Sequence, residues 1–184
     1  KQMFASWMRI LKKVPGSVLW LLRWSDCAKD NLHKQAKKYG ISQDRLVFAD
    51  RTTLDKHLKR LALVDLALDT HPFNGGATTS NALWAGVPVI TLRGNSYLSR
   101  MSSSLLTAAG IPELITQTPK DYEKLAISLA KNPEKLKSIR RSLIVNSKSF
   151  PLFDTQTFVK NLEKAYLKMW EIYSLGKKPQ QIIL

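Results

Sequence analysis

The sequence is poor in the features that mark disulfide-bonded, secreted or membrane-spanning proteins. Its one cysteine, Cys27, can form neither an internal disulfide nor a cysteine metal cluster, and we expect a reduced, half-buried thiol. The longest apolar run, residues 18–22, is far shorter than the roughly 20 residues of a membrane span. The N-terminus has no secretory pattern. These absences predict a globular, cytoplasmic protein with no membrane anchor.

Acidic side chains are scarce too: 14 Asp and Glu against 29 Lys and Arg give a formal charge of +15. Such a charge raises the question of nucleic-acid binding. Residues 61–119, however, carry only two basic and three acidic side chains, so the excess lies toward both ends. In residues 30–38 and 131–141 the lysines alternate with apolar residues at helical spacing and lack interleaved aromatics. This pattern is typical of solvated helix faces and disfavours nucleic acid as a partner.

Hydrophobic residues make up 44% of the chain and form short apolar runs that alternate with amphipathic segments. This order predicts a parallel sheet covered by helices, that is, one Rossmann-like, doubly wound α/β lobe over residues 1–184. Strands are expected at residues 17–22, 45–48, 66–68, 87–92 and 113–115. Helices are expected at residues 4–13, 29–39, 53–63, 78–84, 99–109, 119–131, 133–147 and 157–173.

Both ends of the sequence point beyond this lobe. A helical pattern is already under way at Phe4, so we expect the chain to be a fragment of a larger protein. The long terminal helix at about residues 157–173 has one apolar face, which is expected to pack back on the lobe or against a neighbouring one. That face contains Phe158, Leu162, Ala165, Met169 and Tyr173.

The loop after the third strand is the strongest candidate for a functional site. A glycine pair, Gly75 and Gly76, stands just before a helix that begins with Thr78 and Thr79. The first turn of a helix has unpaired N–H groups and a partial positive charge, so it can hold a phosphate, and the glycines let the backbone come close. An ordinary capped helix after a flexible loop is equally compatible with the pattern. Neither G-x-G-x-x-G nor G-x-x-x-x-G-K-[ST] occurs, which disfavours a dinucleotide enzyme or a P-loop ATPase.

Five stretches form a recognisable series. They are Val-Leu-Trp-Leu-Leu-Arg at 18–23, Leu-Asp-Thr at 68–70, Asn-Gly-Gly-Ala-Thr-Thr at 74–79, Leu-Trp-Ala-Gly-Val-Pro at 83–88 and Ser-Phe-Pro-Leu-Phe-Asp at 149–154. In order and spacing the series resembles the C-terminal catalytic lobe of the O-linked N-acetylglucosamine transferase family. The resemblance implies the donor-binding half of a metal-independent GT-B glycosyltransferase, which moves N-acetylglucosamine from UDP-GlcNAc to protein Ser or Thr. It also implies a missing N-terminal catalytic lobe and preceding tetratricopeptide repeats.

The resemblance also assigns roles to residues of this sequence. His57 matches the uracil-stacking histidine, Arg60 a uracil-contacting arginine, and Thr52 the position whose backbone meets the uracil edge. At the diphosphate, Thr78 matches a family threonine at the helix N-terminus. The full set expected to bind the donor is His57, Arg60, Thr52, Gly75, Gly76, Thr78, Thr79 and Asn81, where Asn81 replaces a ribose-holding aspartate.

Three positions depart from the family pattern. Gly76 replaces a phosphate-contacting histidine, Ala77 a threonine, and Leu54 a ribose-contacting lysine. We expect no catalytic residue, metal ligand or cofactor site in this chain, because the family's diphosphate-binding lysine lies upstream and its catalytic histidine belongs to the other lobe. His71 and His33 match no functional position, and Asp69 is expected to order the loop.

Two alternatives stay open at this point. The departures permit UDP-glucose or another nucleotide sugar as the donor of the same fold, which a donor panel on the full-length protein would separate. The chain could instead be a noncatalytic basic module that binds acidic partners or nucleic acid. Duplex binding would weaken steeply as salt rises, whereas donor binding held by stacking and hydrogen bonds would respond less.

Overall fold

The computed structural model describes residues 2–147 and 149–183, and each of its strands pairs in parallel with its neighbour. β1 (Leu19–Leu22) pairs with β2 (Leu46–Ala49), and β4 (Val89–Leu92) lies between β3 (Ala67–Leu68) and β5 (Ile115–Thr116). The predicted α/β class with parallel strands is confirmed. Within the described residues the strands form two sheets, β1–β2 and β3–β4–β5, where one sheet was predicted.

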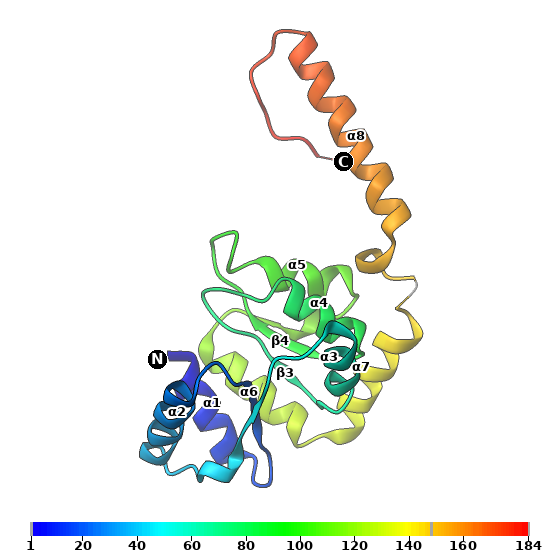
Figure 1. Cartoon of the computed structure of the whole chain (residues 1–184). Coiled ribbons are helices and arrows are strands. Elements are labelled where there is room, and N and C mark those ends of the chain that lie inside the picture. The colour runs from blue at the N-terminus through cyan, green and yellow to red at the C-terminus, as the bar shows by residue number, and fades with distance from the viewer. Residues whose placement is uncertain (1, 148, 184) are drawn as a thin grey trace.

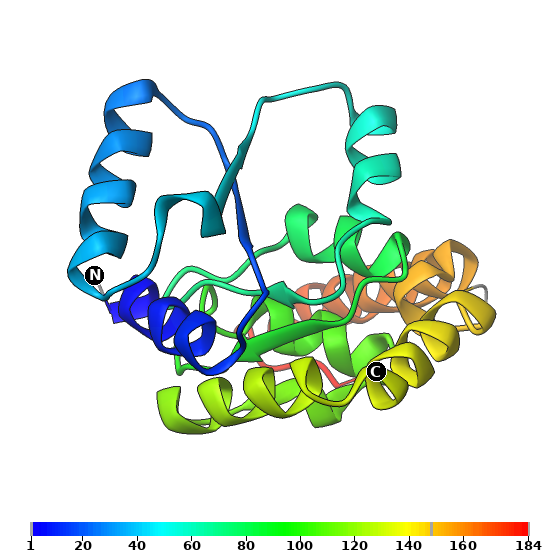
Figure 2. The same ribbon diagram turned by 90° about the horizontal axis from the view of Figure 1, so that it is seen from below.

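A helix follows every strand, as parallel pairing requires, and Figure 2 shows α2 and α3 on opposite sides of the β1–β2 pair. Helix α1 precedes β1, whereas α7 and α8 close the chain. The helices are α1 (Gln2–Lys13), α2 (Asp26–Lys38), α3 (Leu54–Leu61), α4 (Ala77–Trp84), α5 (Met101–Ala108), α6 (Pro119–Ala130), α7 (Pro133–Val145) and α8 (Thr155–Ser174). Each overlaps a predicted helix.

The boundaries differ from the predicted ones where local chemistry decides them. Helix α2 begins at Asp26, earlier than predicted, because the Ser25 hydroxyl accepts a hydrogen bond from Ala28 N at 3.1 Å and caps the helix. Strand β4 begins after Pro88, which has no N–H to add to a ladder. Most of the predicted fifth strand is a 3₁₀ helix, Pro112–Leu114, and β5 follows it.

The core consists of two buried hydrophobic clusters that share one helix. The larger cluster surrounds β4, all four residues of which are buried. The smaller cluster lies among α1, α2 and β2. Helix α1 contributes Ile10 to the larger cluster and Met8 and Leu11 to the smaller one. α1 is therefore the element that packs against both parts of the lobe.

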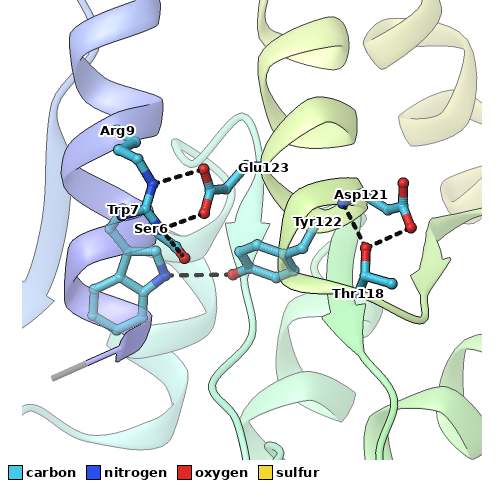
Figure 3. A network of polar contacts seen from close by, with 7 residues as sticks. All are labelled: Ser6, Trp7, Arg9, Thr118, Asp121, Tyr122 and Glu123. Carbon is cyan, nitrogen blue, oxygen red and sulfur yellow. Dashed lines mark hydrogen bonds and ion pairs between the residues drawn. The ribbon is translucent and has the colours of Figure 1, made fainter.

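A polar network joins α1 to α6 beside these clusters (Figure 3). Arg9 forms a two-pronged ion pair with Glu123, with Nε–Oε2 at 2.9 Å and Nη2–Oε1 at 2.6 Å. Next to it, Trp7 Nε1 donates to the hydroxyl of Tyr122 at 3.4 Å. That hydroxyl in turn donates to the carbonyl of Asp69, at the end of β3, at 2.8 Å. The network therefore ties two helices to the end of a strand.

Figure 1 shows α8 projecting away from the sheets, with the last residues of the chain running back along it. Its large apolar side chains are exposed: Phe158 by 62%, Met169 by 53% and Tyr173 by 74%, whereas Ile172 is buried. The apolar face expected from the sequence is thus present and largely uncovered. None of the helices in residues 2–147 and 149–183 has the length and hydrophobicity needed to cross a bilayer.

Arg45 connects the β1–β2 pair to α1 and the residues that follow it. Its guanidinium donates to the carbonyls of Leu11, Val14 and Ser17 at 2.8–3.0 Å. We expect Arg45→Ala to lower the free energy of unfolding by about 2 kcal/mol, because charge-assisted hydrogen bonds to three backbone carbonyls are lost. Urea denaturation measures this. Arg141→Ala, at an exposed position of α7, is the control and should change stability by less than about 0.5 kcal/mol; equal effects would contradict the role of Arg45.

Candidate functional site

The helices that begin at the carboxyl ends of β2, β3 and β4 share an uncommon feature. Among the described residues, no side chain caps the N-terminus of α3, α4 or α5. By contrast, side chains cap the other helices for which an N-cap is defined, α2, α6, α7 and α8. Ligands of open α/β sheets bind at this edge, and uncapped N–H groups favour anions. The structure thus leaves these three helix N-termini without side-chain caps at the carboxyl edges of its two sheets.

The loop between β3 and α4 is held by the Asp69 carboxylate. Gly75 N donates to Asp69 Oδ1 at 2.8 Å, and the Thr91 hydroxyl donates to Oδ2 at 2.6 Å. Burial raises the pKa of the Asp69 carboxyl above its usual range, and the bonds from Thr91 and Gly75 oppose that rise. The expectation that Asp69 orders this loop agrees with these contacts. A pocket lies here, lined by Asp69, Thr70, Gly75, Thr78, Thr79 and the apolar side chains of Ala67, Leu68, Ala82 and Val89.

The two glycines of this loop are not equivalent. A Cβ at Gly75 would lie 2.5 Å from the hydroxyl oxygens of Thr78 and Thr79, so no larger residue fits without a shift. A Cβ at Gly76 would meet Met101 Cγ at 3.7 Å, an ordinary contact. Gly75 is therefore required by close packing, whereas Gly76 leaves room for a side chain.

The α4 residues expected to bind the donor differ in their exposure and in the hydrogen bonds that they already form. Thr78 is exposed, and Asn81 is partly exposed. Thr79 is buried, and its hydroxyl lies 2.9 Å from the Ser102 hydroxyl, with which it is hydrogen-bonded. Ser80 N forms the first bond of α4, to Gly76 O at 2.9 Å. Thr78 can thus present a hydroxyl, whereas the Thr79 hydroxyl is already bonded to Ser102.

The structure brings His57 and Arg60 into direct contact on α3, which packs against α4. Arg60 Nε donates to His57 Nδ1 at 3.1 Å, so a neutral His57 carries its proton on Nε2. Arg60 also donates to Asp50 O at 2.6 Å and lies over the Trp20 ring, 5.1 Å from its centroid. Burial, with the positive charge of Arg60 second, lowers the pKa of His57. The imidazole is thus oriented by Arg60, and its neutral form is favoured.

Several residues around this edge were missed by the sequence analysis. Asp50, whose carbonyl holds Arg60, forms an ion pair with Arg23 at 2.6 Å. The Arg51 guanidinium lies over the ring of exposed Trp24, and its central carbon is 4.5 Å from the ring centroid. All four residues directly follow β1 or β2. Position at the carboxyl end of a parallel strand was the available signal; Thr52, which is exposed nearby, was named through the family resemblance alone.

The structure also describes the surroundings of the other residues that the sequence analysis considered, His71, His33 and Cys27. His71 Nδ1 lies 3.2 Å from Leu92 O, and His33 packs edge-on against Phe48. Cys27 is exposed, so the expectation of a half-buried thiol was wrong: it lies in the first turn of α2, a helix that begins earlier than predicted. In residues 2–147 and 149–183, no group of three or more His, Cys, Asp or Glu side chains converges as metal ligands.

Comparison with known proteins decides the family. Residues 1–162 match the family model described as Glycosyl transferase family 41. The chain belongs to glycosyl transferase family 41. Family 41 relatives include the probable UDP-N-acetylglucosamine–peptide N-acetylglucosaminyltransferase SEC of Arabidopsis thaliana, 39% identical over 176 residues, 95% of this chain and 18% of that protein. The UDP-N-acetylglucosamine–peptide N-acetylglucosaminyltransferase of Caenorhabditis elegans is 33% identical over 92% of this chain and 15% of its own length.

A solved structure supports the same family 41 assignment. A variant of the Thermobaculum terrenum O-GlcNAc transferase superposes with a TM-score of 0.88 and 31% identity, over 92% of this chain and 33% of that chain. The resemblance read from the sequence is confirmed. The chain spans less than a fifth of the two curated relatives and corresponds to part of the catalytic region of O-GlcNAc transferases.

The three positions that depart from the family pattern expected from the sequence lie at the starts of α3 and α4. Leu54 is the first residue of α3 and is 60% exposed, so the position is open to a ligand but presents no charge. Gly76 is the N-cap of α4, and Ala77 is exposed as its first residue. Together they leave the edge roomier and less polar than the family pattern implies.

The paired geometry of α3 predicts the titration of His57. Its pKa should lie below the ordinary value of about 6.5, so that His57 is neutral at pH 7. Arg60→Ala removes the neighbouring positive charge and should raise this pKa, though not above the ordinary value because burial remains the larger cause. Imidazole NMR signals followed against pH measure both values. Lys59→Ala, which removes an exposed charge paired with Asp55, is the control and should leave the pKa unchanged; an Arg60→Ala pKa equal to the wild-type value would contradict the prediction.

Proposed function

We propose that this chain is the donor-binding lobe of a protein O-glycosyltransferase that transfers N-acetylglucosamine from UDP-GlcNAc to Ser or Thr. The observation that carries the proposal is the uncapped N-terminus of α4, which borders a pocket and packs against the helix that presents His57 and Arg60. Family membership supports it, because the Arabidopsis and Caenorhabditis relatives carry this activity in their names.

In this proposal each part of the donor meets a different element. The uracil stacks on neutral His57 and contacts Arg60 and the backbone of Thr52. The diphosphate lies at the start of α4, where free N–H groups, the helix dipole and the Thr78 hydroxyl stabilise its charge as UDP leaves. Gly75 and Gly76 let the backbone approach, Thr79 contributes its N–H, and Asn81 bonds the ribose.

The acid–base chemistry and the acceptor belong to other parts of the protein in this proposal. The acceptor hydroxyl attacks the anomeric carbon and UDP departs, so the groups that handle the acceptor proton must face the donor from outside this lobe. The preceding catalytic lobe and tetratricopeptide repeats would supply these groups and the acceptor-binding surface. Residues 1–184 alone would therefore bind the donor without turnover.

UDP binding can be tested by hydrogen exchange on the full-length protein. Saturating UDP should slow exchange in residues 52–60 and 74–81, because the ligand covers the start of α3 and the N-terminal amides of α4. Exchange in α1, which packs against α6, serves as the internal reference. His57→Ala should weaken UDP binding by about tenfold through loss of the stacking surface. Unchanged exchange in both segments would contradict the proposed site.

Turnover measurements separate the possible donors. Gly76, Ala77 and Leu54 favour a second candidate, UDP-glucose or another nucleotide sugar, because each lacks the polar side chain that the family resemblance leads us to expect at its position. A panel of nucleotide sugars tested for turnover by the full-length protein identifies the donor. Turnover with UDP-glucose but not UDP-GlcNAc would replace the proposed sugar and leave the nucleotide site intact.

We also propose that α8 packs its exposed apolar face against the preceding lobe of the full-length protein. Met169→Glu should lower the melting temperature of the full-length protein by several degrees, because a charge would be buried at that contact. Lys160→Glu, on the opposite face of α8, is the control and should have little effect. Equal melting temperatures for the two variants would count against this contact.

A further inference from the structure

We infer that Asp69 is a positioning residue for the donor site: its side chain fixes the Gly75 peptide and thereby sets the direction of the N–H groups at the start of α4. The inference rests on the proposed function, because the ligand those groups receive is the donor diphosphate. It adds a residue that contacts the loop and does not act on the donor directly.

The first support is that both backbone polar groups of Gly75, its N–H and its carbonyl, are held by side chains. Its N–H donates to Asp69 Oδ1 at 2.8 Å, and its carbonyl accepts from the Ser102 hydroxyl at 2.8 Å. Ser102 also bonds the Thr79 hydroxyl at 2.9 Å, so the same brace reaches the first turn of α4. Gly75 is held by two side chains, one just after β3 and one on α5. Its backbone cannot rotate without breaking one of these bonds.

The second support is that Asp69 itself has almost no freedom. It is 8% exposed, and Thr91, which donates to Oδ2 at 2.6 Å, is fully buried in the middle of β4. The hydroxyl of buried Tyr122 donates to the Asp69 carbonyl at 2.8 Å. The position of the Gly75 N–H is therefore set by the rigid centre of the β3–β4–β5 sheet.

The third support is energetic. A buried carboxylate costs stability, and burial raises the pKa of this one. It also places a negative charge beside a pocket that we assign to an anion, which opposes binding. Asp69 is explained here by the hydrogen bonds that its carboxylate accepts, one on each oxygen. The two donors, Gly75 and Thr91, use both oxygens.

A specific consequence is that the site requires an acceptor at position 69 and does not require its charge. An asparagine can still accept from Gly75 N through Oδ1, while its NH₂ donates to the Thr91 oxygen, and it removes the charge that opposes the diphosphate. An alanine removes the acceptor. The two substitutions should therefore have opposite outcomes for UDP binding.

The experiment uses the full-length protein and measures UDP affinity by calorimetry, together with melting temperature. Asp69→Ala should weaken UDP binding about tenfold or more, the loss expected of a charge-assisted bond. Asp69→Asn should bind UDP within about threefold of the wild type or more tightly. Thr116→Val is the matched control: it removes a buried side-chain bond of the same sheet, from the Thr116 hydroxyl to the Thr91 carbonyl at 2.8 Å, and leaves the contacts of Asp69 with Gly75 and Thr91 in place, so it should lower the melting temperature and leave UDP affinity unchanged.

Each result bears on the inference. Wild-type affinity in Asp69→Ala overturns it, and so does an Asp69→Asn protein as weak as Asp69→Ala, since that would show a need for charge. If Asp69→Ala does not fold, Thr91→Val decides: it keeps the volume, frees the carboxylate and should weaken UDP binding about threefold, whereas unchanged binding overturns the inference. A wild-type protein that does not bind UDP overturns the proposed function itself, a different and distinguishable failure.

Discussion

Parallel pairing of the strands is the constraint on which the rest of this lobe depends. Parallel strands need a crossover after each strand, so β1 to β5 are each followed by a helix and their carboxyl ends open on one edge in each sheet. That arrangement places the starts of α3, α4 and α5 where ligands of such sheets bind. The absence of side-chain caps at these three starts, among the described residues, leaves their N–H groups available.

The elements themselves were predictable because they depend on local patterns. Apolar runs and helical spacing located the strands and helices, and the glycine pair before Thr78 located the loop. Periodic patterns do not predict the single contacts that set the boundaries of these elements. The Ser25 cap moves the start of α2, and Pro112 converts most of a predicted strand into a 3₁₀ helix. The division into two sheets depends on strand pairing across the fold, which periodicity does not report.

The site was predictable in outline for a different reason. His57 and Arg60 are three residues apart on a helix, so their contact follows from sequence spacing. The contacts of Asp69 with Gly75, Thr91 and Tyr122 join residues from four segments, and the chain contains no short motif that records them. The buried hydroxyl of Thr79 shows the same limit: residue type indicated a donor, and the partner that uses it is Ser102, far along the chain.

The shared helix α1 has a consequence for how the lobe folds. Because Ile10 belongs to one hydrophobic cluster and Met8 and Leu11 to the other, neither cluster is complete until α1 has docked on both. Opening the smaller cluster removes packing from the larger one, and the reverse is also true. Two sheets that share no strand pairing in the described residues are thereby joined into a single cooperative unit of unfolding.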